Sequence, residues 1–135
     1  MAREQLGKPR FGRRIDPTDI ASTQARVRVR LGQALLGTDH PGEALGPLQE
    51  AETYYRRERA AGATDTGFRQ DFIRCLYELA LAQTPDSVGR TRRLALLDEA
   101  MTELGGLTPE AQQLVASKEL LKGVSGALRE ARSGE

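Results

Sequence analysis

Leucine and alanine recur three or four residues apart along most of this 135-residue chain, and glycine or proline repeatedly interrupts the pattern. Residues at that spacing share one face of an α-helix, whereas a half-buried strand needs alternation between apolar and polar residues. No segment alternates for long enough to predict a strand. The chain is therefore expected to be all-α, with short connections that make neighbouring helices pack antiparallel.

Capping and helix-breaking residues divide the chain into five expected helices. The first begins at Pro17, with Asp16 as its cap, and runs to about Leu36. The second is expected to start late, near Ala44, and to end at residue 62, because Pro47 would otherwise break a hydrogen bond at a cost of about 3 kcal/mol. The inward stripe of the first helix is expected to comprise Ile20, Val27, Leu31 and Leu35.

The other three helices are expected from the same kinds of signal. The third is capped at Asp65 and runs to residue 82, and the fourth follows the break at residues 84–87 and stops before residues 105–106. Thr108 and Pro109 predict the start of a fifth helix, which continues as far as Leu128.

Composition permits a modest core and excludes several classes of protein. Aromatic residues are only 4% of the chain, so the core must be built from leucine, alanine and valine. Twenty basic and nineteen acidic residues leave a net charge of +1, unlike a polybasic nucleic-acid-binding protein. The single cysteine excludes an internal disulfide and a Cys-rich zinc site. Without a long apolar run or a signal-peptide core, we expect a cytoplasmic protein with no membrane segment.

Residues 1–15 differ from the rest of the chain. They carry five basic residues and one acidic residue, interrupted by glycine and proline, and are interpreted as a basic flexible arm or linker preceding a helical domain at 16–135. Such an arm could contact nucleic-acid phosphates or dock on the more acidic remainder of the chain or of a second copy. A solvated linker is the favoured interpretation, and nucleic-acid binding is not expected.

The second and fourth helices contain related segments. A shift of 49 residues aligns Leu45 with Leu94, Leu48 with Leu97, Glu50 with Glu99, and Ala51 with Ala100. The helices that precede them match at a shift of about 45. An internal repeat of this length is typical of stacked helical hairpins. Two hairpins followed by a final helix are therefore expected.

The first hairpin has a distinctive spacing of small and large residues. Small residues at Gly32, Ala44 and Ala51 would allow close backbone approach, while Leu35 and Leu48 fill the seam. This spacing resembles the tetratricopeptide repeat (TPR) family, and the resemblance covers residues 20–104. It implies a TPR-like α-α superhelix of two hairpins plus a C-terminal capping helix. Residues 55–78 also look similar to repeats in the C-terminal regions of bacterial serine/threonine kinases and signalling proteins. An unrelated helical bundle is the alternative.

The resemblance also implies a binding groove, because the first helices of TPR hairpins line a concave surface. Three of the corresponding residues are arginines, which would suit an acidic peptide or a C-terminal carboxylate. The alternative is that these arginines are ordinary surface residues. The positions carried over are Arg26, Val29, Arg30 and Gln33 in the first helix and Gln70, Arg74 and Tyr77 in the third.

Few residues are suited to catalysis. His40, the only histidine, lies in a turn, and Cys75 falls on the apolar face of the third helix, which predicts a buried thiol. There is no Walker-type phosphate loop and no metal-ligand spacing. We therefore expect no enzyme, catalytic residue, metal or cofactor.

The leading hypothesis is an adaptor that binds a protein or peptide partner through the groove. The alternative is a regulatory C-terminal module of a longer enzyme, such as a bacterial serine/threonine kinase. Repeat proteins usually need about three units for a continuous core, and only two hairpins are visible here. Self-association would also meet that need.

Overall fold

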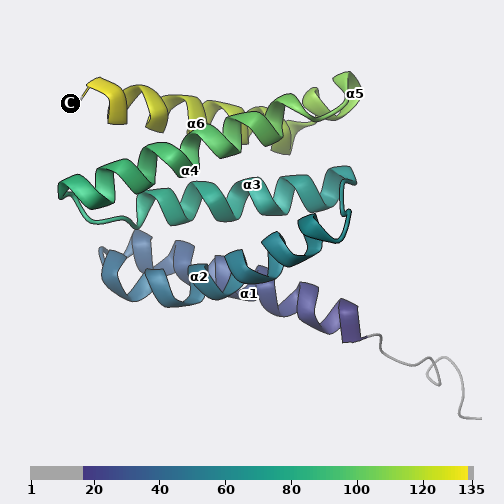
Figure 1. Cartoon of the computed structure of the whole chain (residues 1–135), viewed down its shortest axis with the longest axis horizontal. Coiled ribbons are helices and arrows are strands. Elements are labelled where there is room, and N and C mark those ends of the chain that lie inside the picture. Colours follow the sequence, from purple (N-terminus) through teal and green to yellow (C-terminus); the bar gives the residue numbers. More distant parts are fainter. Residues whose placement is uncertain (1–16, 134–135) are drawn as a thin grey trace, which may run out of the picture.

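The computed structural model describes residues 17–133, which form six helices and no strand. The all-α prediction is therefore confirmed for this range, whereas the arm expected at residues 1–15 lies outside it. The helices are stacked side by side, from α1 and α2 at one end to α6 at the other (Figure 1). They are α1 (Pro17–Gly37), α2 (Pro41–Ala60), α3 (Thr66–Leu81), α4 (Ser87–Gly105), α5 (Pro109–Gln112) and α6 (Val115–Ser133).

Polar caps fix the starts of three helices. In each, a side-chain oxygen accepts a hydrogen bond from the backbone N–H three residues later, over 3.2 Å at Asp65, 2.8 Å at Asp86 and 3.1 Å at Thr108. Such bonds satisfy backbone donors that the first turn of a helix leaves unpaired. The starts predicted at Asp65 and Thr108 are confirmed.

Two predicted boundaries were wrong. Helix α2 begins at Pro41 rather than near Ala44, so Pro47 lies inside it. Proline is favoured at the first position of a helix, which suits Pro41. Pro47 has no N–H to bond the carbonyl of Glu43, and Glu43 is exposed, so this carbonyl is not buried without a partner. The expected fifth helix is split into α5 and α6, where the Leu114 N–H donates to the carbonyl of Ala111 in a tighter turn.

The first hairpin closes at a contact between a glycine and a leucine. A Cβ atom placed on Gly32 would lie 2.5 Å from Cγ of Leu48, so no larger residue fits at position 32 without displacing that side chain. The close approach predicted for the first hairpin is therefore present. Two of the paired repeat positions are also equivalent in burial, since Leu48, Leu97, Ala51 and Ala100 are all fully buried.

The predicted inward stripe of α1 was wrong. Ile20, Val27 and Leu31 are each about half exposed, whereas Ala25 and Val29 are buried. Helix α1 packs on α2 and α3 through small residues. The face of α1 that contacts these helices is the one that permits close approach, not the one that carries its largest side chains. Its outer stripe has no neighbouring helix among residues 17–133.

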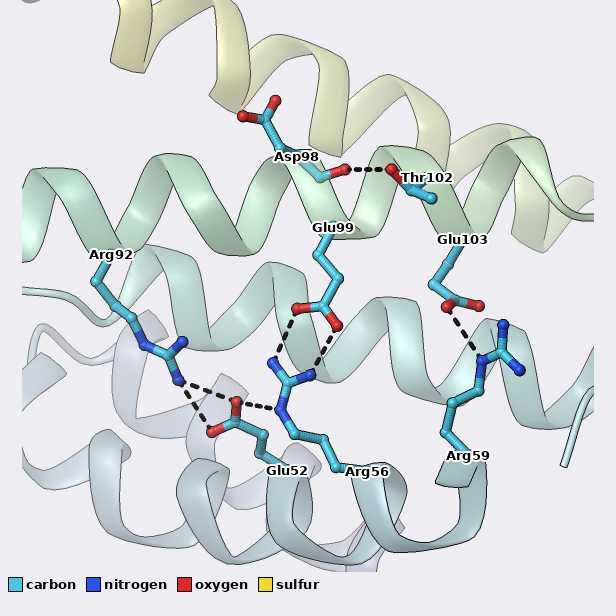
Figure 2. Close-up of polar contacts among 8 residues, drawn as sticks. All are labelled: Glu52, Arg56, Arg59, Arg92, Asp98, Glu99, Thr102 and Glu103. Atoms are coloured by element: carbon cyan, nitrogen blue, oxygen red, sulfur yellow. Dashed lines mark hydrogen bonds and ion pairs between the residues drawn. The ribbon is translucent and has the colours of Figure 1, made fainter. Parts of the chain in front are cut away.

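Arginine–carboxylate pairs join α2 to α4 (Figure 2). The Arg56 guanidinium donates to both carboxylate oxygens of Glu99, over 2.7 and 2.8 Å, and also to Glu52 over 2.8 Å. Arg92 donates to Glu52 from the opposite side over 3.0 Å. We call this network, with the contacts of Glu103 below, the α2/α4 ladder.

The second part of the ladder surrounds Glu103. Its carboxylate accepts from Arg59 over 3.2 Å and from Arg69 over 3.0 Å. Glu103 and Glu52 are both buried, and each contacts two arginines. Burying a charged carboxylate costs free energy because the group loses its hydration. Hydrogen bonds from two guanidinium groups offset that cost for each of these carboxylates. The charged side chains between α2 and α4 are therefore mutually satisfied.

The glycine–leucine contact makes a direct prediction about stability. Gly32→Ala is expected to lower the free energy of unfolding by about 1–3 kcal/mol, because the added methyl group overlaps Leu48. Gly126→Ala is the matched control, since Gly126 is also inside a helix, is not followed by proline, and has open space around its Cβ position. That change should raise the free energy by about 0.5–1 kcal/mol. Urea denaturation followed by circular dichroism would measure both, and equal effects would contradict the packing described.

Candidate functional site

A cleft of about 220 Å³ opens between α1 and α3. It is smaller than the roughly 300–1,000 Å³ of pockets that enclose drug-sized ligands, and it suits a single side chain or a small anion. We call it the α1/α3 cleft. Its lining residues are Arg26, Val29, Arg30, Gln33, Tyr55, Asp71 and Arg74.

Helical periodicity brings these residues together. The four lining residues of α1 occupy positions i, i+3, i+4 and i+7, so they form one stripe along that helix. Asp71 and Arg74 are one turn apart on α3, and Tyr55 reaches the cleft from α2. The cleft is therefore positioned by the packing of three helices rather than by a loop.

The three arginines of the cleft differ from those of the α2/α4 ladder in their partners. Arg26 lies 3.9 Å from the carboxylate of Asp71 and donates to Ser22 over 3.4 Å. Neither Arg30 nor Arg74 has a hydrogen-bond or ion-pair partner within residues 17–133. Two guanidinium groups of the cleft are thus available to a ligand.

A buried carboxylate lies next to the cleft. Glu78 is only 4% exposed, and within residues 17–133 its carboxylate accepts one hydrogen bond, the 2.9 Å contact donated by the Gln33 amide. Burial raises the pKa of Glu78, while the Gln33 hydrogen bond and the charge of Arg74 oppose that rise. Burial likewise raises the pKa of Asp71, against the charges of Arg26 and Arg74. Both carboxylates therefore hold a proton more readily than an exposed acid does.

Tyr55 contributes a buried hydroxyl to the cleft. The residue is 2% exposed, and its ring packs against Tyr54, Phe68 and Phe72. Its hydroxyl has no hydrogen-bond partner among the residues that the structure describes. Burial raises the pKa of Tyr55, and the charge of Asp71 raises it further. The hydroxyl thus stays protonated and can donate a hydrogen bond.

The structure brings together five of the seven residues predicted for the groove. Arg26, Arg30, Gln33 and Arg74 surround the α1/α3 cleft, and Val29 joins them as a buried part of its wall. Val29 is only 4% exposed, because the stripe that buries α1 includes this position. The other two predicted residues, Gln70 and Tyr77, face α6 instead.

Gln70 and Tyr77 connect α3 to α6. The Gln70 amide donates to the buried Ser117 hydroxyl over 3.0 Å. A Cβ atom on Gly123 would lie 3.1 Å from Cζ of Tyr77, so α6 passes close to this ring. Tyr77 also lines a second, wider cleft of about 740 Å³ between α3 and α6, whose charged residues are Glu119, Lys122, Arg129 and Glu130. We call the surface that contains both clefts the α1/α3/α6 face.

Two residues of the α1/α3 cleft were not predicted. Asp71 lies one turn before Arg74, and the same helical stripe that selected Arg74 would have identified it. Tyr55 has an aromatic ring that packs in the core. Nothing in the sequence places its hydroxyl between two other helices.

The residues with the most reactive side chains are engaged elsewhere. Nδ1 of His40 lies 3.1 Å from the Thr38 hydroxyl, in the exposed turn before α2. Cys75 is fully buried with its thiol 3.7 Å from the Leu48 carbonyl, and burial raises its pKa to about 12. Residues 17–133 contain no group of acidic, histidine or cysteine side chains that could hold a metal ion. No helix in that range is long and apolar enough to cross a membrane.

The buried carboxylate predicts a pH-dependent effect on stability. A raised pKa in the folded state means that stability is lost as the pH rises through that pKa. Glu78→Gln removes the buried charge and retains an acceptor for Gln33, so it should raise the melting temperature at neutral pH. The gain should disappear below pH 4.5, the ordinary pKa of glutamate, where the wild-type side chain is protonated in both states.

Melting curves at several pH values would measure this difference. Glu119→Gln, at an exposed position of α6, is the control and should produce no such pH-dependent gain. A loss of stability in Glu78→Gln at neutral pH would show that the charged form of Glu78 is favoured in the folded protein, contrary to the expectation.

Comparison with known proteins adds no relative to this picture. No family model matches the sequence, and no match was found among curated proteins or among solved structures. The role of the α1/α3/α6 face is therefore inferred from the positions and chemistry of its own side chains.

Proposed function

We propose that this chain is a TPR-like helical scaffold that binds an acidic protein or peptide partner through the α1/α3/α6 face. The observation that carries the proposal is the pair of arginines, Arg30 and Arg74, that line a cleft without a carboxylate partner among residues 17–133. Guanidinium groups pair strongly with carboxylates, and an acidic partner supplies what these two lack.

The packing of the helices supports a TPR-like arrangement. Helices α1 and α2 form one hairpin and α3 and α4 a second, and α3 also packs against α1 and α2 of the first hairpin. Helix α6 packs on both α3 and α4, where the first helix of a third hairpin would lie. In this proposal α1, α3 and α6 are the groove-lining helices, and α6 caps the stack.

The state of the reactive side chains supports binding rather than catalysis. A general base needs a positioned partner within a pocket, and a nucleophilic cysteine needs access and a lowered pKa. His40 lies in an exposed turn and Cys75 is buried with a raised pKa. We therefore propose a non-catalytic role for residues 17–133.

Charge reversal in the cleft tests the proposed function. Peptides selected by the wild-type protein from a random display library should be enriched in aspartate and glutamate. The double variant Arg30→Glu, Arg74→Glu should bind these peptides at least about tenfold more weakly, because two charge-assisted contacts are lost. Fluorescence anisotropy with the selected peptides would measure the affinities.

The control applies the same change of charge outside both clefts. Arg57→Glu with Lys118→Glu alters two exposed positions, on α2 and α6, and should leave most of the affinity unchanged. Selected peptides without acidic residues, or equal losses in the two double variants, would contradict the proposal.

A further inference from the structure

The α1/α3 cleft has more positive charge than its own carboxylate compensates. Three guanidinium groups, those of Arg26, Arg30 and Arg74, share the cleft with the single carboxylate of Asp71. Asp71 lies nearest to Arg26, at 3.9 Å, and the buried Glu78 accepts its hydrogen bond from Gln33. The charge of Arg74 also acts on Asp71 and Glu78, but neither Arg30 nor Arg74 donates a hydrogen bond to a carboxylate within residues 17–133, so their donors remain for an external anion.

The buried hydroxyl of Tyr55 is a further donor in this cleft. Tyr55 is the one α2 residue among those that line the cleft, and it is only 2% exposed. A buried hydroxyl without a partner loses its hydrogen bonds to water and gains none in exchange. A ligand oxygen in the cleft would accept a hydrogen bond from this hydroxyl and so offset the free-energy cost of burying it.

These groups together define what a ligand must provide. It must be small, carry negative charge and offer several oxygens that only accept hydrogen bonds. A carboxylate has one charge and two oxygens, whereas a phosphate monoester has a charge of about −1.5 to −2 and three acceptor oxygens. The phosphate matches both free arginines and the tyrosine hydroxyl at once.

We propose that the α1/α3 cleft binds a phosphate monoester, presented by a phosphorylated side chain of the partner. This inference rests on the proposed function, since it identifies the group by which an acidic partner is held. Arg30 and Arg74 pair with the phosphate oxygens, Tyr55 donates from the wall of the cleft, and Asp71 limits the affinity through its negative charge.

Titration with small probes tests the inference directly. O-phosphoserine, inorganic phosphate and N-acetylaspartate would be added to the full chain at pH 7.5 and constant ionic strength, with binding followed by NMR. O-phosphoserine should shift the side-chain signals of Arg30 and Arg74 and bind at least about tenfold more tightly than N-acetylaspartate. Inorganic phosphate that matches O-phosphoserine would show that phosphate alone is sufficient.

Three variants separate a binding role from a structural one. Arg30→Ala should weaken O-phosphoserine binding by about tenfold, and Asp71→Asn should strengthen it. Tyr55→Phe should weaken binding several-fold without lowering the melting temperature, because the ring remains and only an unpartnered hydroxyl is removed. Arg57→Ala is the control outside the cleft and should have no effect.

The inference is overturned if O-phosphoserine and N-acetylaspartate bind equally, or if neither shifts the cleft signals. It is also overturned if Tyr55→Phe leaves O-phosphoserine affinity unchanged. In either case the proposed function stands if unphosphorylated acidic peptides still lose affinity in the Arg30→Glu, Arg74→Glu variant. If those peptides bind that variant normally while O-phosphoserine binding is abolished, the proposed acidic-peptide function fails instead.

Discussion

Burial of α3 is the constraint on which the other helices depend. This helix packs against α1, α2, α4 and α6, and seven of its ten residues from Phe72 to Leu81 are buried. In that segment only Arg74, Tyr77 and Leu81 remain partly exposed, and their spacing places them on one stripe of the helix. Because α1 and α6 lie on the two sides of that stripe, a cleft forms on each side of it. The candidate site is thus a consequence of how the core is built.

The arginines of the α2/α4 ladder and those of the α1/α3 cleft have different physical roles. Those of the α2/α4 ladder are held by carboxylates, two of which are themselves buried. Removing one partner of such a network leaves an uncompensated charge, so its members constrain the relative positions of α2 and α4. Arg30 and Arg74 have no such partner among residues 17–133, and their charge is therefore available for recognition.

Local signals in the sequence were sufficient for much of the fold. The caps at Asp65 and Thr108 and the close approach at Gly32 could be predicted because each depends on residues of one hairpin or one turn. The exposure of Ile20, Val27 and Leu31 could not, since periodicity gives the stripes of a helix but not which of them a neighbour covers. The break between α5 and α6 has no glycine or proline to indicate it.

The candidate site was predictable only in part, for the same reason. Groove positions carried over from a repeat pattern identified four cleft residues of α1 and Arg74, because they follow helical spacing. The hydroxyl of Tyr55 reaches the cleft from a third helix, and the ladder joins residues about 40 positions apart, as in Arg56 with Glu99. Contacts of that kind depend on the packed structure as a whole.

Hydrogen exchange of arginine Nε–H groups, measured by NMR, tests the central distinction most directly. In the free protein Arg56 and Arg69 should exchange slowly, because their Nε atoms donate to Glu52 and to the Thr64 carbonyl. Arg30 and Arg74 should exchange rapidly and become protected only when an anionic ligand is bound. Equal protection of all four groups in the free protein would contradict the account, since the cleft arginines would then already be engaged.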